Sequence, residues 1–340
     1  MRTAIMGAGS LGTITGALIA KNGGKVILID ANKAHVEELN KNGATIAGKM
    51  ELNNVPVTAI TPEQMEGIYD IVILMAKQTY NDVALKQLLP HLGPNSVVCT
   101  LQNGIPEEGV GKIIGPDRVV GGVVGWGASW LRPGVSELTS DISAMRFEIG
   151  EISGKKTDRI KQISTILKLA GECVEVDNLT GIRWTKLIQN ATLSGMSAAL
   201  GVTYAEILDD DKATACAAYV GNEILKIVKK RDIVLEDIVP GWSYYSLGFD
   251  SREGLEKAKQ WLREYFIPHR KLKASMLQDM EKGIKCEINH INGVACDWGR
   301  ELGIPTPVND TIVEIVKGFE AGEISFPTMK CLDVFELPEL

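Results

Sequence analysis

The chain has 340 residues, of which 45% are hydrophobic and 23% are charged, and its formal net charge is −7. This composition excludes a disordered or fibrous protein, and no block rich in lysine and arginine points to a nucleic-acid partner. The length predicts two domains, each with its own core. No apolar run approaches the ~20 residues that a membrane-spanning helix needs, so we expect no membrane partner.

The six cysteines are scattered along the chain, and no two of them have the C-x2-C spacing of a zinc or redox site. We therefore expect no metal. Scattered thiols in a chain of this length favour a reducing compartment, and no signal-peptide segment precedes the first predicted strand. Both observations predict a cytoplasmic protein.

The first half alternates short apolar runs with amphipathic segments, which is the pattern of a parallel sheet covered on both faces. The predicted strands are 3–7, 25–30, 70–76, 96–102 and 119–125, and the predicted helices are 10–22, 33–42, 80–89 and 106–114. Two further strands, 134–138 and 146–151, are expected to complete the same sheet.

After about residue 178 strand signals almost disappear, and helical periodicity covers 179–200, 203–230, 251–280, 284–302 and 308–321. The stretch 237–251 is rich in Pro, Gly, Ser and aromatic residues, which predicts an irregular loop. The sequence therefore predicts an α/β fold, with a parallel-sheet domain over residues 1–177 and an all-helical domain over residues 178–340.

A glycine-rich turn follows the first predicted strand and has the pattern G-x-G-x-x-G. In that pattern the first glycine makes a tight turn, the second admits a pyrophosphate, and the third allows close helix–strand packing. The phosphates would lie at the amino end of the following helix. Because the turn joins a strand to a helix, we predict a Rossmann dinucleotide site that includes Gly7, Ala8, Gly9, Ser10, Leu11 and Gly12.

Asp30 ends the second predicted strand. A carboxylate at this position accepts hydrogen bonds from both ribose hydroxyls of NAD and repels the 2′-phosphate of NADP. Lys33, close by in the chain, weakens that repulsion. We therefore predict NAD as the cofactor, with NADP as the alternative; the other interpretation is that Asp30 merely ends a strand.

Two polar residues follow apolar strands at the edge where ligands bind in open α/β sheets. Lys77 comes after the strand 70–76, and Asn103 comes after the strand 96–102. Lys77 could meet a substrate carboxylate or the cofactor, and Asn103 could hydrogen-bond the nicotinamide ribose or the substrate. A solvated strand end is the alternative for each.

The helical half contains a segment, 181–201, with few polar side chains. Lys186 and Asn190 are four residues apart and share one helix face, and Ser194 is one further step along it. A polar stripe on an apolar helix is costly without partners. A solvated surface stripe is the alternative, but the apolar neighbours favour burial.

A third polar cluster lies in the segment 275–293, which contains Ser275 and Glu287. On one straight helix these residues would be ~18 Å apart, too far to contact one small substrate. Gly283 offers a break at which the chain could turn back and bring them to one cleft. The alternative for Glu287 is an acid on a helix surface.

These segments together resemble the ketopantoate reductase family. The matching segments, in order, are 7–12, 76–77, 101–104, 133–151, 186–191 and 275–294. The resemblance implies a Rossmann domain followed by a helical domain, with the active site between them. It also implies hydride transfer between a nicotinamide and C2 of a 2-oxo acid, which gives an (R)-2-hydroxy acid.

The resemblance assigns roles to individual residues. Lys186 matches the catalytic lysine, which polarises the substrate carbonyl and donates a proton to it. Glu287 matches the second catalytic residue, which helps to orient that lysine or the cofactor ribose. Outside the glycine turn, the resemblance implies Lys77, Asn103 and Glu287 as cofactor-binding positions, and Asp30 is predicted as one from its place after the second strand. The implied substrate-binding positions are Asn103, Lys186, Asn190, Ser194 and Ser275.

Three departures from the family pattern leave the substrate open. Family members usually use NADPH and carry a basic residue where this chain has Asp30. Ser194 stands where the family has a second substrate-binding asparagine, and the segment 237–270 is unusually aromatic. Aromatic residues of this kind favour a core or a subunit interface over a pocket lid. Asp30 and Ser194 both favour an NAD-dependent D-2-hydroxyacid dehydrogenase of the D-mandelate type.

Two other classes are weaker alternatives. A non-catalytic dinucleotide sensor would not need both Lys186 and Glu287. A 3-hydroxyacid or opine dehydrogenase would not have the segment 275–293. The sequence therefore predicts an enzyme that acts on a small 2-oxo acid, and the aromatic helical half favours a homodimer.

Overall fold

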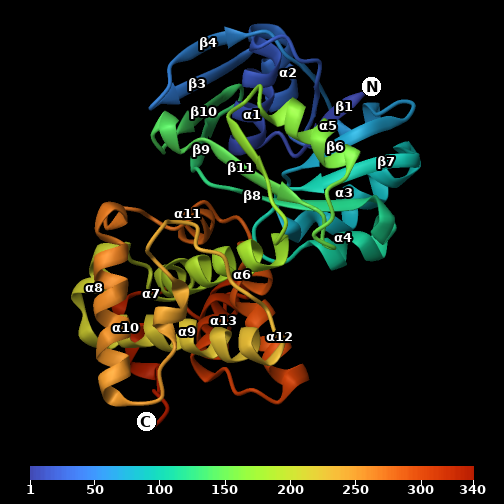
Figure 1. Ribbon diagram of the computed structural model, residues 1–340. Helices are drawn as coiled ribbons and strands as arrows, with labels where there is room; N and C mark the ends of the chain where they lie inside the picture. Colours follow the sequence, from blue (N-terminus) through green and yellow to red (C-terminus); the bar gives the residue numbers. More distant parts are fainter. The chain divides into compact units, whose positions relative to one another are not determined.

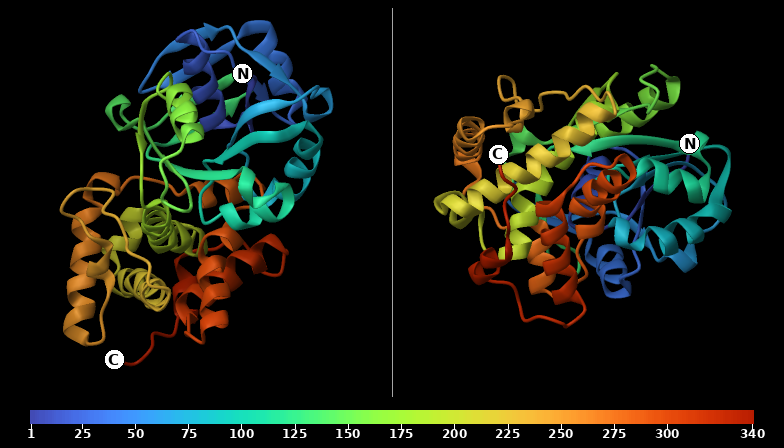
Figure 2. Two further views of the ribbon diagram at one scale, coloured as in Figure 1. Left: turned by 45° about the vertical axis from the view of Figure 1, so that its right-hand side comes forward. Right: turned by 90° about the horizontal axis from the view of Figure 1, so that it is seen from below.

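The computed structural model describes all 340 residues, and the chain divides into two compact units, Met1–Leu179 and Thr180–Leu340. Figures 1 and 2 show the mixed α/β architecture of the first unit and the helical architecture of the second. The predicted α/β fold with a helical second half is confirmed. None of the helices combines the length and the apolar character that a membrane span requires.

The first unit is built around an eight-stranded sheet whose central strands are parallel. Its strands, in spatial order, are β12 (Glu172–Glu175), β11 (Arg146–Gly150), β8 (Val119–Val124), β7 (Leu92–Thr100), β6 (Tyr69–Leu74), β1 (Thr3–Met6), β2 (Ile27–Ile29) and β5 (Thr58–Ile60). From β1 the chain builds outward to β2 and β5, and then returns to the other side of β1 to form β6. This reversal places a topological switch point between β1 and β6, where such sheets bind ligands.

Alternating side chains of the central strands are buried on both faces of this sheet. Ile5, Ile71 and Ile73 belong to one apolar cluster, while Met6 and Val72 belong to the other. The helices of this unit are α1 (Ser10–Lys21), α2 (Lys33–Asn42), α3 (Asn81–Leu88), α4 (Glu107–Ile114) and α5 (Asp158–Leu167). Residues of α1 and α5 join the first cluster, and residues of α3 and α4 join the second. Burial on both faces explains why the central strands are near-continuous apolar runs in the sequence.

One strand prediction was wrong in its placement. The predicted strand 134–138 does not complete the large sheet, whereas β11 does, by pairing antiparallel with β8. Instead β10 (Val135–Leu138) lies in a separate four-stranded sheet with β4 (Leu52–Val55), β3 (Ala44–Gly48) and β9 (Ala128–Arg132). This small sheet packs on α1. Strands β3, β4, β5, β9 and β12 and helix α5 were not predicted from the sequence.

The second unit is entirely helical. Its helices are α6 (Leu179–Gln189), α7 (Met196–Leu200), α8 (Tyr204–Asp209), α9 (Asp211–Lys230), α10 (Arg252–Tyr265), α11 (Ser275–Glu281), α12 (Asn292–Leu302) and α13 (Pro307–Glu320). The 20-residue helix α9 contacts α8, α10, α12 and α13 and so forms the centre of this unit (Figure 2). The irregular stretch 237–251 contains only one short 3-10 turn, as predicted.

Two predicted helices of this unit are interrupted. The predicted helix 203–230 breaks at Asp210, whose carboxylate accepts a 2.8 Å hydrogen bond from the backbone N–H of Ala213 and so starts α9. The predicted helix 251–280 ends at Tyr265 and resumes at Ser275. Capping by Asp210 therefore divides the first of these segments, which hydrophobic periodicity alone had joined.

The aromatic segment contributes to the interior of this unit. Trp261 stacks on Tyr265 with ring centroids 4.8 Å apart, and Tyr244 contacts both rings edge-on. Tyr244 and Tyr265 are buried. These contacts agree with the interpretation of this segment as core.

Glu223 on α9 gives the helical unit a pH-dependent stability. Its carboxylate is buried at the amino end of α13, and burial raises its pKa from an ordinary 4.5 to about 7. Because the folded-state pKa is the higher one, the contribution of this group to stability is full below pH ~4.5 and is lost as the pH rises through ~7. Between pH 5 and pH 8 the unfolding free energy of the wild type should therefore fall relative to that of Glu223→Gln, by about 3 kcal/mol.

Urea unfolding of both proteins across this pH range measures the difference. Glu314→Gln, at an exposed position on α13, is the control and should track the wild type. A constant difference between the wild type and Glu223→Gln would contradict the assignment.

Candidate functional site

The glycine turn depends on contacts that only glycine permits. A Cβ built on Gly7, which has φ +97°, would lie 2.2 Å from the backbone N of Ala76 at the end of β6. A Cβ on Gly12 would lie 2.2 Å from the carbonyl oxygen of Gly7. The backbone N–H groups of Gly7 and Ala8 donate to the carbonyl of Ile29, the last residue of β2. The turn is therefore fixed against the ends of both neighbouring strands.

Gly9 differs from the other two glycines in a way that fits a dinucleotide. It is exposed, and a Cβ built on it would meet nothing within 4 Å. Gly9 is also the N-cap of α1, where no side chain caps the helix and no acidic residue lies in the first turn. The amino end of α1 thus offers backbone N–H groups and a positive dipole end to an anion. These features fit a pyrophosphate, which residues 7–12 would hold.

Asp30 lies directly beyond β2 and next to this turn. Its Oδ1 accepts a 2.9 Å hydrogen bond from the backbone N–H of Asn32, and Asn32 in turn caps α2. Asp30 is half-buried, whereas Lys33 is exposed. The second carboxylate oxygen of Asp30 remains available to a ribose.

Lys77 and Asn103 follow β6 and β7, two adjacent parallel strands next to the switch point. The backbone N–H of Ala76 donates to the carbonyl of Met6, so Lys77 follows directly on the strand that borders the glycine turn. The side-chain amide of Gln78 donates to the carbonyl of Asn103. Both Lys77 and Asn103 are half-buried. The first unit therefore gathers the glycine turn, Asp30, Lys77 and Asn103 at the carboxyl ends of adjacent strands.

Sequence reasoning missed His35, whose buried side chain hydrogen-bonds the backbone of the glycine turn. Its ring is fully buried, its Nδ1 accepts from the backbone N–H of Gly134, and its Nε2 lies 2.8 Å from the carbonyl oxygen of Ala8. This pattern assigns the neutral tautomer with the proton on Nε2. Thr13 of α1 also donates to the Ala8 carbonyl. The pattern of apolar residues along α2 could not predict this supporting role, because the hydrogen-bond partners of His35 lie in distant parts of the chain.

Gln102 also supports this edge. Its side-chain amide donates 2.6 Å hydrogen bonds to the carbonyl of Ala76 and to Oδ1 of Asn81. It thereby ties the end of β6 to the amino end of α3, next to Lys77. Its position beside Asn103 in the sequence was the only available signal.

In the second unit, Lys186 is on α6 and its ammonium is held by a neighbour on the same helix. Lys186 Nζ donates a 3.0 Å hydrogen bond to Oε1 of Gln189, and Nε2 of Gln189 lies 3.5 Å from the hydroxyl of Tyr265. Burial raises the pKa of Tyr265, which stays neutral. Partial burial, and to a smaller extent the charge of Lys186, lower the pKa of His269. Gln189 and, through it, Tyr265 are therefore polar neighbours of Lys186 within this unit.

The predicted helix 179–200 is present but is not α-helical throughout. Residues Asn190–Gly195 form a π-helical turn between α6 and α7, so the step from Asn190 to Ser194 does not follow α-helical spacing. Ser194 is buried and its hydroxyl lies 2.7 Å from the hydroxyl of Tyr204. Lys186 and Asn190 remain one α-helical step apart, and Asn190 is half-buried.

In the third polar cluster the helix breaks near Gly283, as predicted. Helix α11 ends at Glu281, and Gly283 follows with φ +66°. Ser275 is exposed at the first position of α11, which packs against the π turn and α7, while Glu287 is buried just before a short 3-10 turn. Helix α11 thus packs against the π turn that begins at Asn190.

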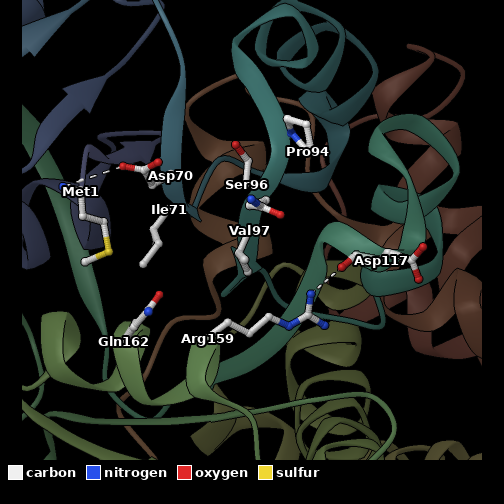
Figure 3. Close-up of a pocket in the computed structure, with 10 residues that line it drawn as sticks. Met1, Asp70, Ile71, Pro94, Ser96, Val97, Asp117, Arg159 and Gln162 are labelled. Carbon is white, nitrogen blue, oxygen red and sulfur yellow. Dashed lines mark hydrogen bonds and ion pairs between the residues drawn. The ribbon is translucent and has the colours of Figure 1, made fainter.

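An open hollow of about 610 Å³ lies elsewhere in the first unit, at the amino ends of the strands (Figure 3). Its guanidinium, Arg159, is paired with the carboxylate of Glu151 and the carbonyl of Asp117. Of its two acids, Asp70 accepts from the backbone N–H of Arg2, and the charge of Asp117 interacts with that of Arg159. Since these charges are paired internally and ligands bind at the opposite strand ends, this hollow is not the candidate site. No group of three or more His, Cys, Asp or Glu side chains gathers to hold a metal.

Comparison with known proteins decides the family. Two family models match, "Ketopantoate reductase PanE/ApbA" over residues 3–154 and its C-terminal model over residues 178–320. A 2-dehydropantoate 2-reductase from Mesorhizobium japonicum is 30% identical over 93% of this chain and 97% of that protein. The chain belongs to the ketopantoate reductase family. A 2-dehydropantoate 2-reductase from Archaeoglobus fulgidus is 29% identical over 94% of this chain and 98% of its own.

The fold of this chain is also similar to solved structures of the ketopantoate reductase fold. A D-mandelate dehydrogenase in complex with NADH and anilino(oxo)acetate superposes with a TM-score of 0.81 at 23% identity, covering 95% of this chain and 99% of its own. A ketopantoate reductase from Ralstonia eutropha superposes with a TM-score of 0.80 at 24% identity, with the same coverage. At these identities the structures support the shared fold. Family membership makes the chain an oxidoreductase with a nicotinamide dinucleotide cofactor and a small-molecule substrate.

The contrast between Gly9 and Gly12 gives a test of the dinucleotide site. Gly9→Ala adds a methyl group to open space, so stability should stay unchanged while the Kd for the dinucleotide rises about tenfold or more, because the methyl group blocks the approach of the pyrophosphate. Gly12→Ala, the matched variant, adds the same methyl group against the Gly7 carbonyl and should cost about 1–3 kcal/mol of stability.

Fluorescence titration with NADH and NADPH measures the affinity, and urea unfolding measures the stability. Unchanged dinucleotide affinity in Gly9→Ala would place the pyrophosphate elsewhere.

Proposed function

We propose that this protein is a reductase of a 2-oxo acid that uses NAD(H) and gives an (R)-2-hydroxy acid, the type of reaction that 2-dehydropantoate 2-reductase carries out. The observation that carries the proposal is Lys186, a cation on a largely buried helix whose ammonium is oriented by Gln189. Such a group is suited to polarise a carbonyl and to protonate its oxygen. When bound, the nicotinamide supplies the hydride that C2 receives.

The residues of the chain supply the proton and the binding groups. Lys186 donates its proton to the carbonyl oxygen as C2 is reduced, and water then returns a proton to the neutral amine. Glu287 helps to orient Lys186 or the cofactor ribose. The substrate carboxylate and side chain are bound by Asn103, Asn190, Ser194 and Ser275, and the cofactor is bound by residues 7–12, Asp30, Lys77 and Asn103.

Asp30 supports NAD over NADP. Its carboxylate lies at the end of β2, beside the turn that would hold the pyrophosphate, and would repel a 2′-phosphate. Lys33 is exposed, so its charge is well screened by solvent. We therefore assign NAD(H) as the working cofactor, with NADP(H) as the alternative.

Ser194 supports a second candidate substrate. Its hydroxyl is already paired with that of buried Tyr204, so it offers less hydrogen-bonding capacity than an asparagine. The rings of Tyr204 and Phe266 pack edge-to-face with centroids 5.9 Å apart. This apolar surrounding favours a D-2-hydroxyacid dehydrogenase that acts on another branched or aromatic 2-oxo acid. Ketopantoate, and with it a place in pantothenate synthesis, remains the first candidate.

A dinucleotide sensor without activity is the weaker alternative, since it would not require an oriented lysine. We also infer a homodimer in the cytoplasm. None of the six cysteines is in a disulfide, which suits a reducing compartment.

The cofactor assignment predicts a coenzyme preference. With a panel of 2-oxo acids that includes ketopantoate and phenylglyoxylate, the wild type should use NADH at least about tenfold better than NADPH in kcat/KM. Asp30→Ser should lose most of that preference, because it removes the negative charge while keeping a hydroxyl for the ribose. A strong wild-type preference for NADPH would defeat the argument from Asp30, and turnover of ketopantoate far above all other acids would remove the second candidate.

The proton-donor assignment predicts a graded loss of activity. Lys186→Ala should lower kcat by about 10²–10⁴-fold while leaving the NADH affinity unchanged. Gln189→Leu should lower kcat about tenfold, since Lys186 loses its orienting partner. Gln260→Leu, on the exposed face of α10, is the control and should behave as the wild type. Steady-state kinetics and NADH titration measure both effects, and full activity of Lys186→Ala would remove the lysine from the mechanism.

A further inference from the structure

The π turn Asn190–Gly195 is built by side chains from elsewhere in the second unit as well as by its own. A π turn shifts the backbone pairing by one residue, so α-helical hydrogen bonds are lost at its start. The hydroxyl of Thr192 donates to the carbonyls of Ile188 and Gln189, at 3.0 and 3.1 Å. The carbonyl of Ala191 accepts a 3.1 Å hydrogen bond from the side-chain amide of Asn292 on α12. The turn therefore depends on a residue 101 positions away.

Asn292 also contacts the far end of the turn. A Cβ built on Gly195 would lie 2.4 Å from Oδ1 and 2.8 Å from Nδ2 of Asn292. Asn292 is fully buried, so this amide fills the space that a side chain at residue 195 would take. One side chain thus fixes both Ala191 and Gly195, the residues that flank the interior of the turn.

Asn292 is itself held by a chain of buried polar groups. Its Nδ2 donates a 3.0 Å hydrogen bond to Oδ1 of Asn309 on α13. Nδ2 of Asn309 donates a 2.7 Å hydrogen bond to Oε2 of Glu223 on α9, and the backbone N–H groups of Val308 and Asn309 donate to the same carboxylate. Glu223, Asn309 and Asn292 are each at most 3% exposed. Asn292 Nδ2 therefore donates in two directions, to the Ala191 carbonyl and to Asn309, and Asn309 donates in turn to the Glu223 carboxylate. Asn292 Oδ1 has no hydrogen-bond partner, so the orientation of this amide is set by its two donor bonds.

A buried polar chain of this kind is not explained by stability alone. Apolar residues of similar volume often serve the stability of a core as well or better than buried charged groups do. Directional hydrogen bonds, in contrast, fix the position of the group at their end. Here that group is the backbone of the turn that carries Asn190, one helical step after Lys186.

We propose that Glu223, Asn309 and Asn292 are positioning residues that hold the π turn in the shape that presents Asn190 to the substrate. The inference rests on the proposed function, since it assigns the turn to 2-oxo acid binding. The three residues act through Ala191 and contact neither substrate nor cofactor. Because Lys186 precedes the turn, substrate affinity depends on the relay more strongly than the chemical step does.

The test uses Asn292→Leu and Asn309→Leu, which keep the approximate volume and remove the donors. Each should raise the KM for the 2-oxo acid about tenfold or more, with kcat within about threefold and the NADH affinity unchanged. The double variant should be no worse in KM than Asn292→Leu, because Asn309 acts only through Asn292. Ile312→Val, a buried control on the same helix as Asn309, should lose stability without a change in KM.

Where a leucine variant does not fold, Asn292→Ser and Asn309→Ser keep a donor of shorter reach and take its place. Unchanged KM in the folded relay variants, or strictly additive effects in the double variant, would overturn the proposal.

Hydrogen exchange over residues 188–196 separates this proposal from the proposed function. Amides of that segment should exchange faster in Asn292→Leu than in Ile312→Val, whatever the substrate. Equal exchange in the two variants would overturn the relay even if the enzyme reduces 2-oxo acids. A wild type that reduces none of them would overturn the proposed function and the assignment of the turn to substrate, while the exchange result would still show whether the relay holds the turn.

Discussion

The contact on which the dinucleotide-binding edge depends is the approach of the first turn to the end of β6. Gly7 lies against Ala76 and Gly12 lies against Gly7, at distances where no Cβ fits. This packing brings Lys77 beside the turn and leaves Gly9 facing open space. His35 and Gln102 then fix the surrounding carbonyls with buried hydrogen bonds. The candidate cofactor site thus depends on three glycines. Gly7 and Gly12 allow the close packing of the turn, and Gly9 leaves open space for a pyrophosphate.

The second unit differs from the first because it holds polar groups within a helical interior. Lys186 is oriented by Gln189, Ser194 is paired with Tyr204, and Ala191 is held by Asn292. Each of these polar groups therefore has a partner, which low-dielectric surroundings require. The π turn allows Asn190 and Ser194, four residues apart, to have different surroundings. This difference agrees with the proposal that Asn190 binds a feature common to 2-oxo acids, whereas Ser194 contacts the part of the substrate that differs between them.

Local pattern was sufficient for the glycine turn, the central parallel strands and the helical second half, because each depends on neighbours in sequence. It was not sufficient where partners are distant. The strand 134–138 joined a small sheet with β3 instead of the large sheet, and the π turn depends on Asn292. His35 gave no signal because its hydrogen-bond partners, Ala8 and Gly134, are not adjacent to it in sequence. The roles proposed for Lys186 and Glu287 come from the family resemblance, because periodicity alone left them open.

The central claim is that the chain moves a hydride from a nicotinamide to C2 of a 2-oxo acid. The most direct measurement follows deuterium from NADH that is dideuterated at C4 of the nicotinamide into the product, by NMR and mass spectrometry. We expect the (R)-2-hydroxy acid to carry one deuterium at C2. A hydroxy acid without deuterium at C2, or no product from any 2-oxo acid in the panel, would contradict the account.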